Sequence, residues 1–481
     1  MVRHLVLSCL CVGCALRTPP AHEQVLQQAL PKTTTVRPTW SAASAAAGDV
    51  TNDWVSSFAD SGLVTVVAEA VANNPDVRQA AARVAIAQQS AVVVGAALKP
   101  QVGAQFGAAA TLVSGDSSLF AAYHATGSVS WEIDIWGKVR AQRAAAQAQY
   151  EATALEFAFA IQSLAATAGE SWYLTIETRQ LVELSRQAVA IYTGLLDLVK
   201  VKRAAGRVSD LDVAQASANL SVAQSQLSQA EALYAEARRG LETLIGRYPA
   251  AELEVADTFT ALPPPIQAGL PSELLERRPD VLAAERQVLA AFRQEEAAKL
   301  SLLPSFSLGA LAGLVANPGM MANPIFSVLN LNPWLVHGLI GMTVPIYQGG
   351  RLQAQVRIAT AQQEQAIARY GGVVLTAFRE VENALNNERV LAQRLTYGEQ
   401  ANAGRTEAVR IGTLKYEAGS IDLLSVLILQ ADQLSSQAEL IRIRTAQRTN
   451  RIQLHLALGG GFDTKTAAAL PVAVIQPAQP Q

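Results

Sequence analysis

The sequence predicts a mainly α-helical protein with a small membrane β part and an internal two-fold repeat. Three observations support this fold class: two very long stretches contain no proline, four short segments alternate in hydrophobicity, and a set of positions recurs once along the chain. Charged residues make up 16% of the 481 residues, below the roughly 25% of an average globular protein. This alanine-rich composition suits long, closely packed helices better than one thick globular core.

The N-terminal residues predict export and attachment to a lipid. A short basic region precedes an apolar stretch, and Val12-Gly13-Cys14 is similar to the end of a bacterial lipoprotein cleavage box. We therefore expect residues 1–13 to be a signal peptide, Cys14 to carry the lipid, and residues 14–60 to form a lipid-anchored linker. The alternative is an apolar N-terminus without lipid. All three cysteines lie in this segment, which fits a chain exported to an oxidising compartment.

A duplication divides the rest of the chain. Pro75-Asp76-Val77 recurs as Pro279-Asp280-Val281, and the segment that begins at Gly206 recurs at Gly419. The residues between the two copies are rich in proline and predict a stiff linker, whereas the C-terminal residues have low complexity and predict disorder. The expected parts are a first repeat (61–250), a linker (251–270), a second repeat (271–460) and a disordered tail (461–481).

Four segments alternate in hydrophobicity and predict strands, two in each repeat. Along the first segment, the even positions from Val102 to Leu112 are apolar and the odd positions are mostly Gly or polar. Such alternation over about ten residues is typical of strands with one face in lipid and one in water. Four strands cannot close a barrel, because the smallest known have about eight, so several chains would be needed; two soluble hairpins are the alternative. The strands are expected at about 101–113, 124–136, 304–315 and 335–347.

The proline-free stretches Lys138–Ala205 and Arg351–Glu417 predict the longest helices. At about 1.5 Å per residue, each would be about 100 Å long. Apolar residues recur every three or four positions in the first of these stretches and in the return helix that follows it, which predicts coiled-coil packing. A tube of helices explains such lengths, and a soluble coiled-coil rod is the alternative. No stretch of about 18 uncharged apolar residues predicts a transmembrane helix. The shorter helices are expected at Leu63–Ala97, Ser209–Ile245, Val281–Leu302 and Ser420–Leu458.

The sequence contains no recognisable catalytic arrangement. The five histidines are scattered without metal-ligand spacing, and no nucleotide-binding glycine loop or nucleophile elbow is present. Glu132 and Asp134 lie two positions apart like paired carboxylates, but the whole of that strand face is polar and predicts a wet surface. The net charge of -2 and the lack of a long basic run argue against a nucleic-acid partner. We expect no enzymatic activity, no cofactor and no metal.

Several motifs resemble the TolC/NodT-type outer-membrane efflux factors over nearly the whole mature chain. The most specific is Leu274-Leu275-Glu276-Arg277-Arg278-Pro279-Asp280-Val281, followed by Ala284-Glu285. The other motifs are Trp54-x3-Phe58 with Asn74-Pro75-Asp76, Leu303-Pro304-Ser305-Phe306, Pro345-Ile346-Tyr347-Gln348-Gly349-Gly350-Arg351, and Tyr416-x2-Gly419 leading to Gln430.

The resemblance implies a non-enzymatic outer-membrane lipoprotein of a tripartite RND-type efflux system. Three copies would form a homotrimer, in which each chain gives four strands to a twelve-stranded β-barrel in the outer-membrane lipid and its helices to an α-barrel tube in the periplasm. The tube would meet a periplasmic adaptor (membrane fusion protein) and an inner-membrane RND-type pump, which supplies the energy for a passive duct. The implied cargo is small, drug-type compounds. The alternatives are a channel for one cargo class (metal ion, siderophore or secreted polypeptide) and a periplasmic coiled coil without a pore.

The resemblance also implies two functional regions at the periplasmic end. The first is a pair of helix-hairpin tips that touch the adaptor, although these segments would also serve as simple turns. The second is the aperture, where members of the family often carry an acidic residue two positions before the Gln that matches Gln430. Ile428 stands there in this chain and Asp432 follows one turn later, so the gate would be apolar or have its charge displaced. The expected tip residues are Arg203, Gly206, Val208, Ser209, Asp210, Tyr416, Gly419, Ile421 and Asp422.

Overall fold

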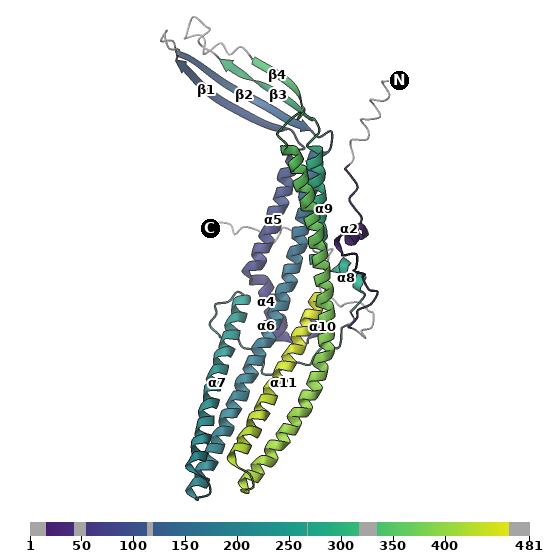
Figure 1. Cartoon of the computed structure of the whole chain (residues 1–481). Coiled ribbons are helices and arrows are strands. Elements are labelled where there is room, and N and C mark those ends of the chain that lie inside the picture. Colours follow the sequence, from purple (N-terminus) through teal and green to yellow (C-terminus); the bar gives the residue numbers. More distant parts are fainter. Residues whose placement is uncertain (1–15, 43–53, 113–118, 267, 317–333, 461–481) are drawn as a thin grey trace. The chain divides into compact units, whose positions relative to one another are not determined.

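The computed structural model describes residues 16–42, 54–112, 119–266, 268–316 and 334–460 (Figure 1). It is mainly helical with one small sheet, as the sequence predicts. In chain order, the elements are α2 (His22–Ala29), α3 (Trp54–Ser57), α4 (Ser61–Asn73), α5 (Pro75–Ala96), β1 (Gln101–Leu112), β2 (Leu119–Ile133), α6 (Lys138–Ala204), α7 (Asp210–Leu244), α8 (Pro271–Arg277), α9 (Pro279–Leu300), β3 (Ser305–Ala316), β4 (Trp334–Thr343), α10 (Arg351–Glu417) and α11 (Leu423–Ala457).

The chain forms two compact units, and each unit takes segments from both halves of the sequence. Unit 1 contains the sheet, α2, and the parts of α5, α6, α9 and α10 that adjoin the strands. Unit 2 contains the remaining parts of these helices together with α3, α4, α7, α8 and α11. Unit 1 comprises residues 1–34, 83–154 and 283–372, and unit 2 comprises residues 35–82, 155–282 and 373–481.

The four strands form one antiparallel sheet in the order β1-β2-β3-β4. Val102 of β1 is opposite Val129 of β2, and Val129 is opposite Ala310 of β3. This register places the alternating apolar positions of all four strands on the same face, because successive side chains of a strand point to opposite faces. On the other face lie Ser128 and Ser130 with further serines, threonines, glutamines and glycines, and also Leu311 and Leu339. The sheet therefore has one apolar face and one mixed, more polar face.

The apolar face of the sheet is uncovered in the single chain. Phe106 of β1 is 80% exposed and Ile340 of β4 is 87% exposed. Val102, Val336 and Met342 on the same face are also exposed. Large exposed apolar areas mark surfaces that meet another protein or a membrane.

Two strands end where polar groups or proline interrupt the ladder. β2 covers 119–133 instead of the expected 124–136, because Asp134 leaves the sheet to cap α6: its carboxylate accepts hydrogen bonds from the N–H groups of Val139 (3.0 Å) and Arg140 (2.9 Å). β4 ends at Thr343 instead of near 347, just before Pro345, which has no N–H to donate.

The acidic residues at the end of β2 have separate cationic partners. Glu132 Oε1 lies 2.6 Å from Lys138 Nζ, and Asp134 Oδ2 lies 3.2 Å from Arg140 Nε. The two carboxylates therefore join the strand to the start of α6 instead of acting together on one ligand.

The two long helices occupy the stretches that the sequence predicts. α6 and α10 each contain 67 residues, which corresponds to about 100 Å at 1.5 Å per residue. Among the described residues, no helix has both the length and the apolar composition needed to cross a membrane.

The expectation of one helix over 63–97 is wrong. α4 ends at Asn73, Asn74 is extended (ψ 129°), and a new helix, α5, begins at Pro75. Proline lacks the N–H that a continuing helix needs and forces the preceding residue out of the helical region. The same break occurs in the second repeat, where α9 begins at Pro279 and not at Val281 as expected. Proline suits the first position of a helix, where its missing N–H costs nothing.

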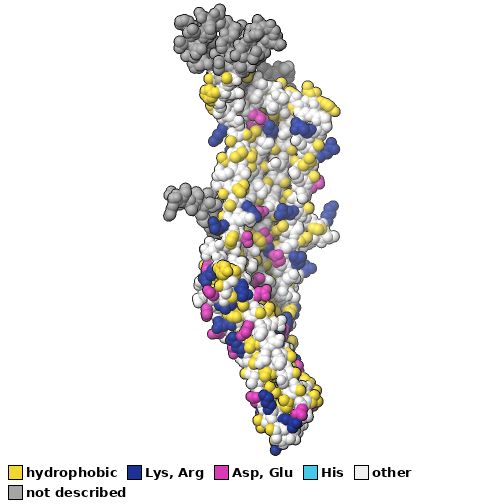
Figure 2. Space-filling view, turned by 90° about the vertical axis from the view of Figure 1, so that its left-hand side faces the viewer, with side chains coloured by type: hydrophobic (Ala, Val, Ile, Leu, Met, Phe, Trp, Pro, Cys, Tyr) yellow, Lys and Arg dark blue, Asp and Glu magenta, His cyan; other side chains and the backbone are white. Residues whose placement is uncertain are grey.

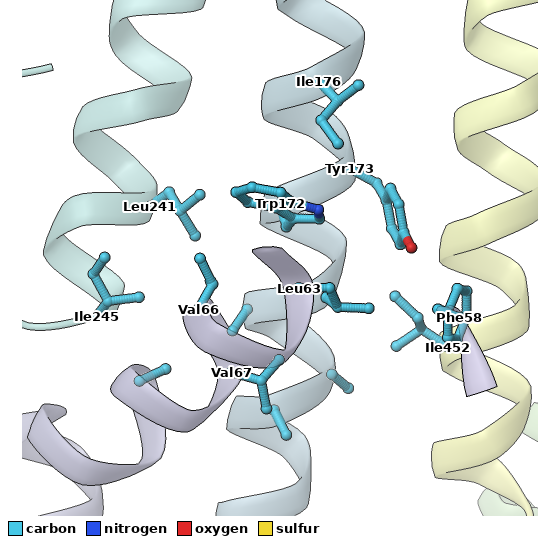
Figure 3. Packing of buried hydrophobic residues seen from close by; sticks show 14 of the residues in the cluster. Phe58, Leu63, Val66, Val67, Trp172, Tyr173, Ile176, Leu241, Ile245 and Ile452 are labelled. Carbon is cyan, nitrogen blue, oxygen red and sulfur yellow. The ribbon is translucent and has the colours of Figure 1, made fainter. Parts of the chain in front are cut away.

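Unit 2 contains a hydrophobic core between α4, α6, α7 and α11 (Figure 3). Leu63 of α4, Trp172 of α6 and Ile452 of α11 are almost completely buried. Gly169 lies against this core, and a Cβ there would be 2.9 Å from Ile452 Cδ1, so glycine allows the close approach of α11. Asp60 fixes the start of α4, because its carboxylate accepts hydrogen bonds from Leu63 N–H and Trp172 Nε1, both at 3.0 Å.

Arginine side chains hold the segment between the repeats against the helices of unit 2. Arg238 Nε donates to the Leu253 carbonyl (2.8 Å), and Arg451 Nη1 donates to the Pro263 carbonyl (2.7 Å). Arg451 is 2% exposed and also forms an ion pair with Glu388. These donors satisfy carbonyl groups of a segment that has no ladder of its own.

Candidate functional site: the helix-hairpin tips

The two helix hairpins of unit 2 end in turns of the same construction. Gly206 (φ 69°) follows α6 and Gly419 (φ 78°) follows α10, and both adopt the left-handed conformation that glycine tolerates best. The N–H of Gly206 donates to the Arg203 carbonyl (2.9 Å), and the N–H of Gly419 donates to the Tyr416 carbonyl (3.0 Å). Each turn thus satisfies carbonyl groups that the helix end would leave unpaired.

The return helices α7 and α11 begin with side-chain caps. The Asp212 carboxylate accepts a hydrogen bond from the N–H of Ser209 (2.8 Å), and Ser209 Oγ accepts one from the N–H of Asp212. In the second hairpin, Asp422 Oδ1 accepts from the N–H of Ser425 (2.9 Å). Hydrogen bonds from Ser209 lower the pKa of Asp212, and those from Ser425 lower the pKa of Asp422. Negative charge at these helix N-termini is favourable.

An exposed ion pair spans the first tip. Arg203 Nε lies 2.7 Å from Asp210 Oδ1, and Arg203 Nη2 lies 3.0 Å from Asp210 Oδ2. The hydrogen bond between them raises the pKa of Arg203 and lowers the pKa of Asp210. An exposed pair of this kind contributes little stability. Both side chains are accessible to a partner because they are exposed.

Lys202 of α6 and Tyr416 of α10 connect the two hairpins. Lys202 Nζ lies 3.9 Å from the centre of the Tyr416 ring and donates a hydrogen bond to the Tyr416 carbonyl. Tyr416 is 3% exposed and belongs to a buried cluster with Val199 of α6 and Leu427 of α11, and burial raises the pKa of its hydroxyl. Since a cation above an aromatic ring is attracted to it, this contact holds the ends of α6 and α10 together.

Most of the expected tip residues are exposed at the hairpin ends. Val208 and Ile421 are half-buried and pack against the cluster that contains Tyr416. The Tyr416 side chain lies inside this cluster, so it holds the hairpins together and is not on the exposed surface. The exposed members of the expected set are Arg203, Gly206, Ser209, Asp210, Gly419 and Asp422.

The expected aperture residues lie on one stripe of α11. Ile428 is 54% exposed, and Asp432 is exposed one turn further along. Leu424, one turn before Ile428, is 49% exposed and extends the stripe. Gln430 lies on another side of the helix, is buried, and has no partner for its Oε1 within the described part of the chain. The stripe is therefore apolar at Leu424 and Ile428 and acidic at Asp432.

The comparison with known families identifies the chain. A model of the outer membrane efflux protein family matches residues 66–247 and 270–460. The chain belongs to this family. Its location is therefore the outer membrane, and its relatives are efflux channels instead of enzymes.

Relatives in this family are named for different cargo. The chain is 30% identical over 477 residues to the pyoverdine export outer membrane protein OpmQ of Pseudomonas aeruginosa, covering 96% of this chain and 97% of that protein. It is 30% identical over 450 residues to the toluene efflux pump outer membrane protein TtgC of Pseudomonas putida (90% and 89% covered). It is 25% identical over 413 residues to the cation efflux system protein CusC of Escherichia coli (85% and 88% covered).

Solved structures share the fold of this efflux-family chain. A crystal structure of a membrane protein from Pseudomonas aeruginosa is 25% identical and superposes with a TM-score of 0.79, covering 93% of this chain and 98% of that one. The CmeC outer membrane channel of Campylobacter jejuni is 19% identical with a TM-score of 0.80 (95% and 97% covered).

Several residues of the tips are not among those predicted from the sequence. The contact of Lys202 with Tyr416 joins residues that are far apart in the chain, so no local pattern indicates it. Leu211 is 73% exposed and Val201 is 66% exposed beside the turn of the first hairpin. Leu211 and Val201 could have been found from the sequence, because each is an apolar residue outside the heptad stripe of its helix.

Two further expectations concern lipid and metal. Cys14, the expected lipid attachment residue, lies outside the described residues. Within the described ranges, no group of three or more His, Cys, Asp or Glu side chains is arranged to hold a metal ion.

Proposed function

We propose that the chain is the outer-membrane channel subunit of a tripartite efflux system, in which three copies form one passive duct for small organic molecules. The sheet carries this proposal. Its apolar face is uncovered from Phe106 to Ile340, and β1 and β4 are each paired on one side only within the described strands. An apolar face suits lipid, and unpaired strand edges favour pairing with another chain. The sheets of three copies would therefore meet edge to edge in the membrane.

The hairpin tips support a protein partner in the periplasm. Val201 and Leu211 expose large apolar side chains there, beside the exposed charges of Arg203 and Asp210. Apolar side chains rimmed by charge are typical of protein–protein interfaces. We propose a periplasmic adaptor as this partner, with an inner-membrane RND-type pump as the energy source and Cys14 as the lipid anchor. The aperture would be formed by the Ile428 and Asp432 stripes of three copies.

A nucleic-acid partner has no support. The net charge is -2, and basic and acidic side chains are interspersed on the face drawn in Figure 2. This net charge supplies no overall electrostatic attraction to phosphate, on which such binding depends.

The cargo is proposed as a class of compounds and not as a single compound, because relatives named for pyoverdine, toluene and cations resemble the chain to similar extents. We propose small organic compounds of the drug type as the first candidate. A channel dedicated to one cargo class, such as a siderophore, is the second, and the similarity to OpmQ favours it.

A planar lipid bilayer tests the proposed function. Detergent-purified protein should insert and produce stepwise ion currents of uniform size. Variants with a charge on the apolar face, such as Ile340→Lys, should insert much less often, because a cation in the middle of the lipid is costly. Ser128→Lys on the polar face is the matched control and should insert as the unmodified chain does. A protein that stays soluble without detergent and yields no current would overturn the proposal.

A further inference from the structure

Unit 1 contains a groove whose lining is entirely uncharged. The groove has a volume of about 690 Å³ and is lined by side chains of α5, α6, α9 and α10. Cavities that hold drug-sized molecules typically measure about 300–1,000 Å³. The lining residues are Ala87, Ser90, Val93, Val94, Ala97, Gln142, Ala145, Ala146, Gln149, Gln287, Ala290, Ala291, Gln294 and Gln362.

The glutamines of the groove follow the helical repeat. Gln142 and Gln149 are seven positions apart on α6, and Gln287 and Gln294 are seven positions apart on α9. A spacing of seven puts two side chains on the same face of a helix. α6 and α9 therefore each present a stripe of amide groups with alanines between them, and Gln362 of α10 adds a fifth amide.

This lining has a definite chemical preference. A primary amide donates two hydrogen bonds and accepts others without carrying charge. Val93 is 72% exposed and, with the alanines, supplies apolar contact. The lining contains no Asp, Glu, His, Cys or Met, which are the side chains that would hold a metal cation, and no Lys or Arg to hold an anion.

We propose that this glutamine groove is a cargo-binding surface for uncharged, amphipathic organic molecules that carry amide, hydroxyl or carbonyl groups. The inference rests on the proposed function, since it requires that cargo passes along unit 1. It narrows the cargo, because metal cations and strongly anionic compounds find no charged partner in the groove.

Single-channel recording tests the inference with a matched pair of probes. Chloramphenicol is an uncharged aromatic compound with an amide and two hydroxyl groups, and chloramphenicol succinate carries an ester with a free carboxylate in place of one hydroxyl. Chloramphenicol should interrupt the ion current of the full-length protein, and the succinate should do so much less. Replacing Gln142 and Gln294 together by Leu keeps the volume similar and removes two amides. This variant should shorten the chloramphenicol interruptions about tenfold, as expected for the loss of two hydrogen bonds.

The control and the contrary outcomes keep the two claims separate. Gln224→Leu changes an exposed glutamine on α7 and should leave the interruptions unchanged. Absence of any current in the unmodified protein would overturn the proposed function. Normal currents with unchanged chloramphenicol interruptions in the double variant would overturn only the proposal that the groove binds cargo. Loss of trimers in the double variant, measured by native mass spectrometry, would show that another copy of the chain covers the groove and would also overturn the inference.

Discussion

Asn74 and Arg278 make equivalent hydrogen bonds in the two repeats. Asn74 Nδ2 donates to the carbonyl of Leu244, the last residue of α7, at 2.9 Å, and Arg278 Nη1 donates to the carbonyl of Ala457, the last residue of α11, at 3.1 Å. Both donors directly precede the proline that starts the next helix. Each therefore ties a helix break to the end of the return helix of its own repeat.

Arg278 has additional partners that make it sensitive to substitution. Its guanidinium binds Asp280 (3.0 and 2.7 Å) and Glu380 (2.7 Å), and its side chain is 3% exposed. Arg278→Met should lower the free energy of unfolding by about 2 kcal/mol, because it removes the hydrogen bonds to Asp280 and Glu380 and the donor to the Ala457 carbonyl. Guanidinium denaturation followed by circular dichroism measures this. Arg239→Met, at an exposed site on α7, is the control and should change the free energy of unfolding by less than about 0.5 kcal/mol. Equal losses of stability in both variants would contradict a stabilising role of the Arg278 contacts.

Asp60 should be needed for the start of α4 and for the position of Trp172. Asp60→Ala removes both hydrogen bonds of its carboxylate and should lower the free energy of unfolding by about 2–4 kcal/mol, the sum of a lost cap and an unsatisfied buried indole N–H. Asp60→Asn keeps one acceptor oxygen and should lower the free energy of unfolding by less. Thermal melting followed by Trp fluorescence compares the variants. The same loss for both would mean that the carboxylate does not act as a double acceptor.

The Lys202–Tyr416 contact should hold the hairpin ends closed. Lys202→Met removes the cation above the ring, a contact of about 1 kcal/mol, and should accelerate hydrogen exchange of the backbone amides around Tyr416. Lys202→Arg keeps a cation above the ring, so the same backbone amides should exchange more slowly in this variant than in the Met variant. In bilayers, the Met variant should also show larger or more frequent currents. Unchanged exchange in the Met variant would remove this contact from the account of the tips.

His455 should make the stability of unit 2 depend on pH. Burial, followed by the positive charge of Arg451, lowers the pKa of His455 to about 4. In the unfolded chain the pKa returns to about 6.5, so between these values the unfolded state binds more protons. Stability should therefore be complete above pH 6.5 and should fall by about 1.4 kcal/mol per pH unit as the pH drops towards 4.

A substitution isolates this pH effect. His455 stacks on Trp54 (6.0 Å between ring centres), so His455→Phe keeps the aromatic packing and removes the titrating group. The free energy of unfolding, measured by denaturation, should change less between pH 7 and pH 5 in the Phe variant than in the unmodified chain. If it changes equally in both, other groups cause the pH dependence.

The aperture stripe predicts a change in ion selectivity. Under the proposed function, Asp432→Asn removes one carboxylate from each copy and should reduce the preference for cations, whereas Ile428→Asp should increase it, because a ring of carboxylates attracts cations. Reversal potentials in a salt gradient measure the selectivity. Asp257→Asn, which removes an exposed carboxylate elsewhere in unit 2, is the control. Equal reversal potentials for all variants would place the aperture elsewhere.

Local patterns in the sequence were sufficient for the long helices, the strands and the turns. The absence of proline defines α6 and α10, and alternation defines β1, because these signals depend only on neighbouring residues. The helix break at Pro75 was missed because the apolar periodicity continues through it, although proline itself was a sufficient signal.

Contacts between distant segments could not be predicted in this way. Lys202 meets Tyr416 and Arg278 meets Glu380 only after the two repeats have folded together, and no local pattern specifies these pairs. The burial of Tyr416 has the same origin, since a tyrosine near a turn is equally compatible with an exposed surface. The roles of the tip and aperture residues stay predictions.

Electron microscopy of the detergent-extracted protein, with its mass measured in parallel, tests the channel most directly. The proposed function predicts a particle with three-fold symmetry, the mass of three chains, and a hollow helical part about 100 Å long, from the rise per residue of α6 and α10. A single chain in solution, or a rod without a central hollow, would contradict it.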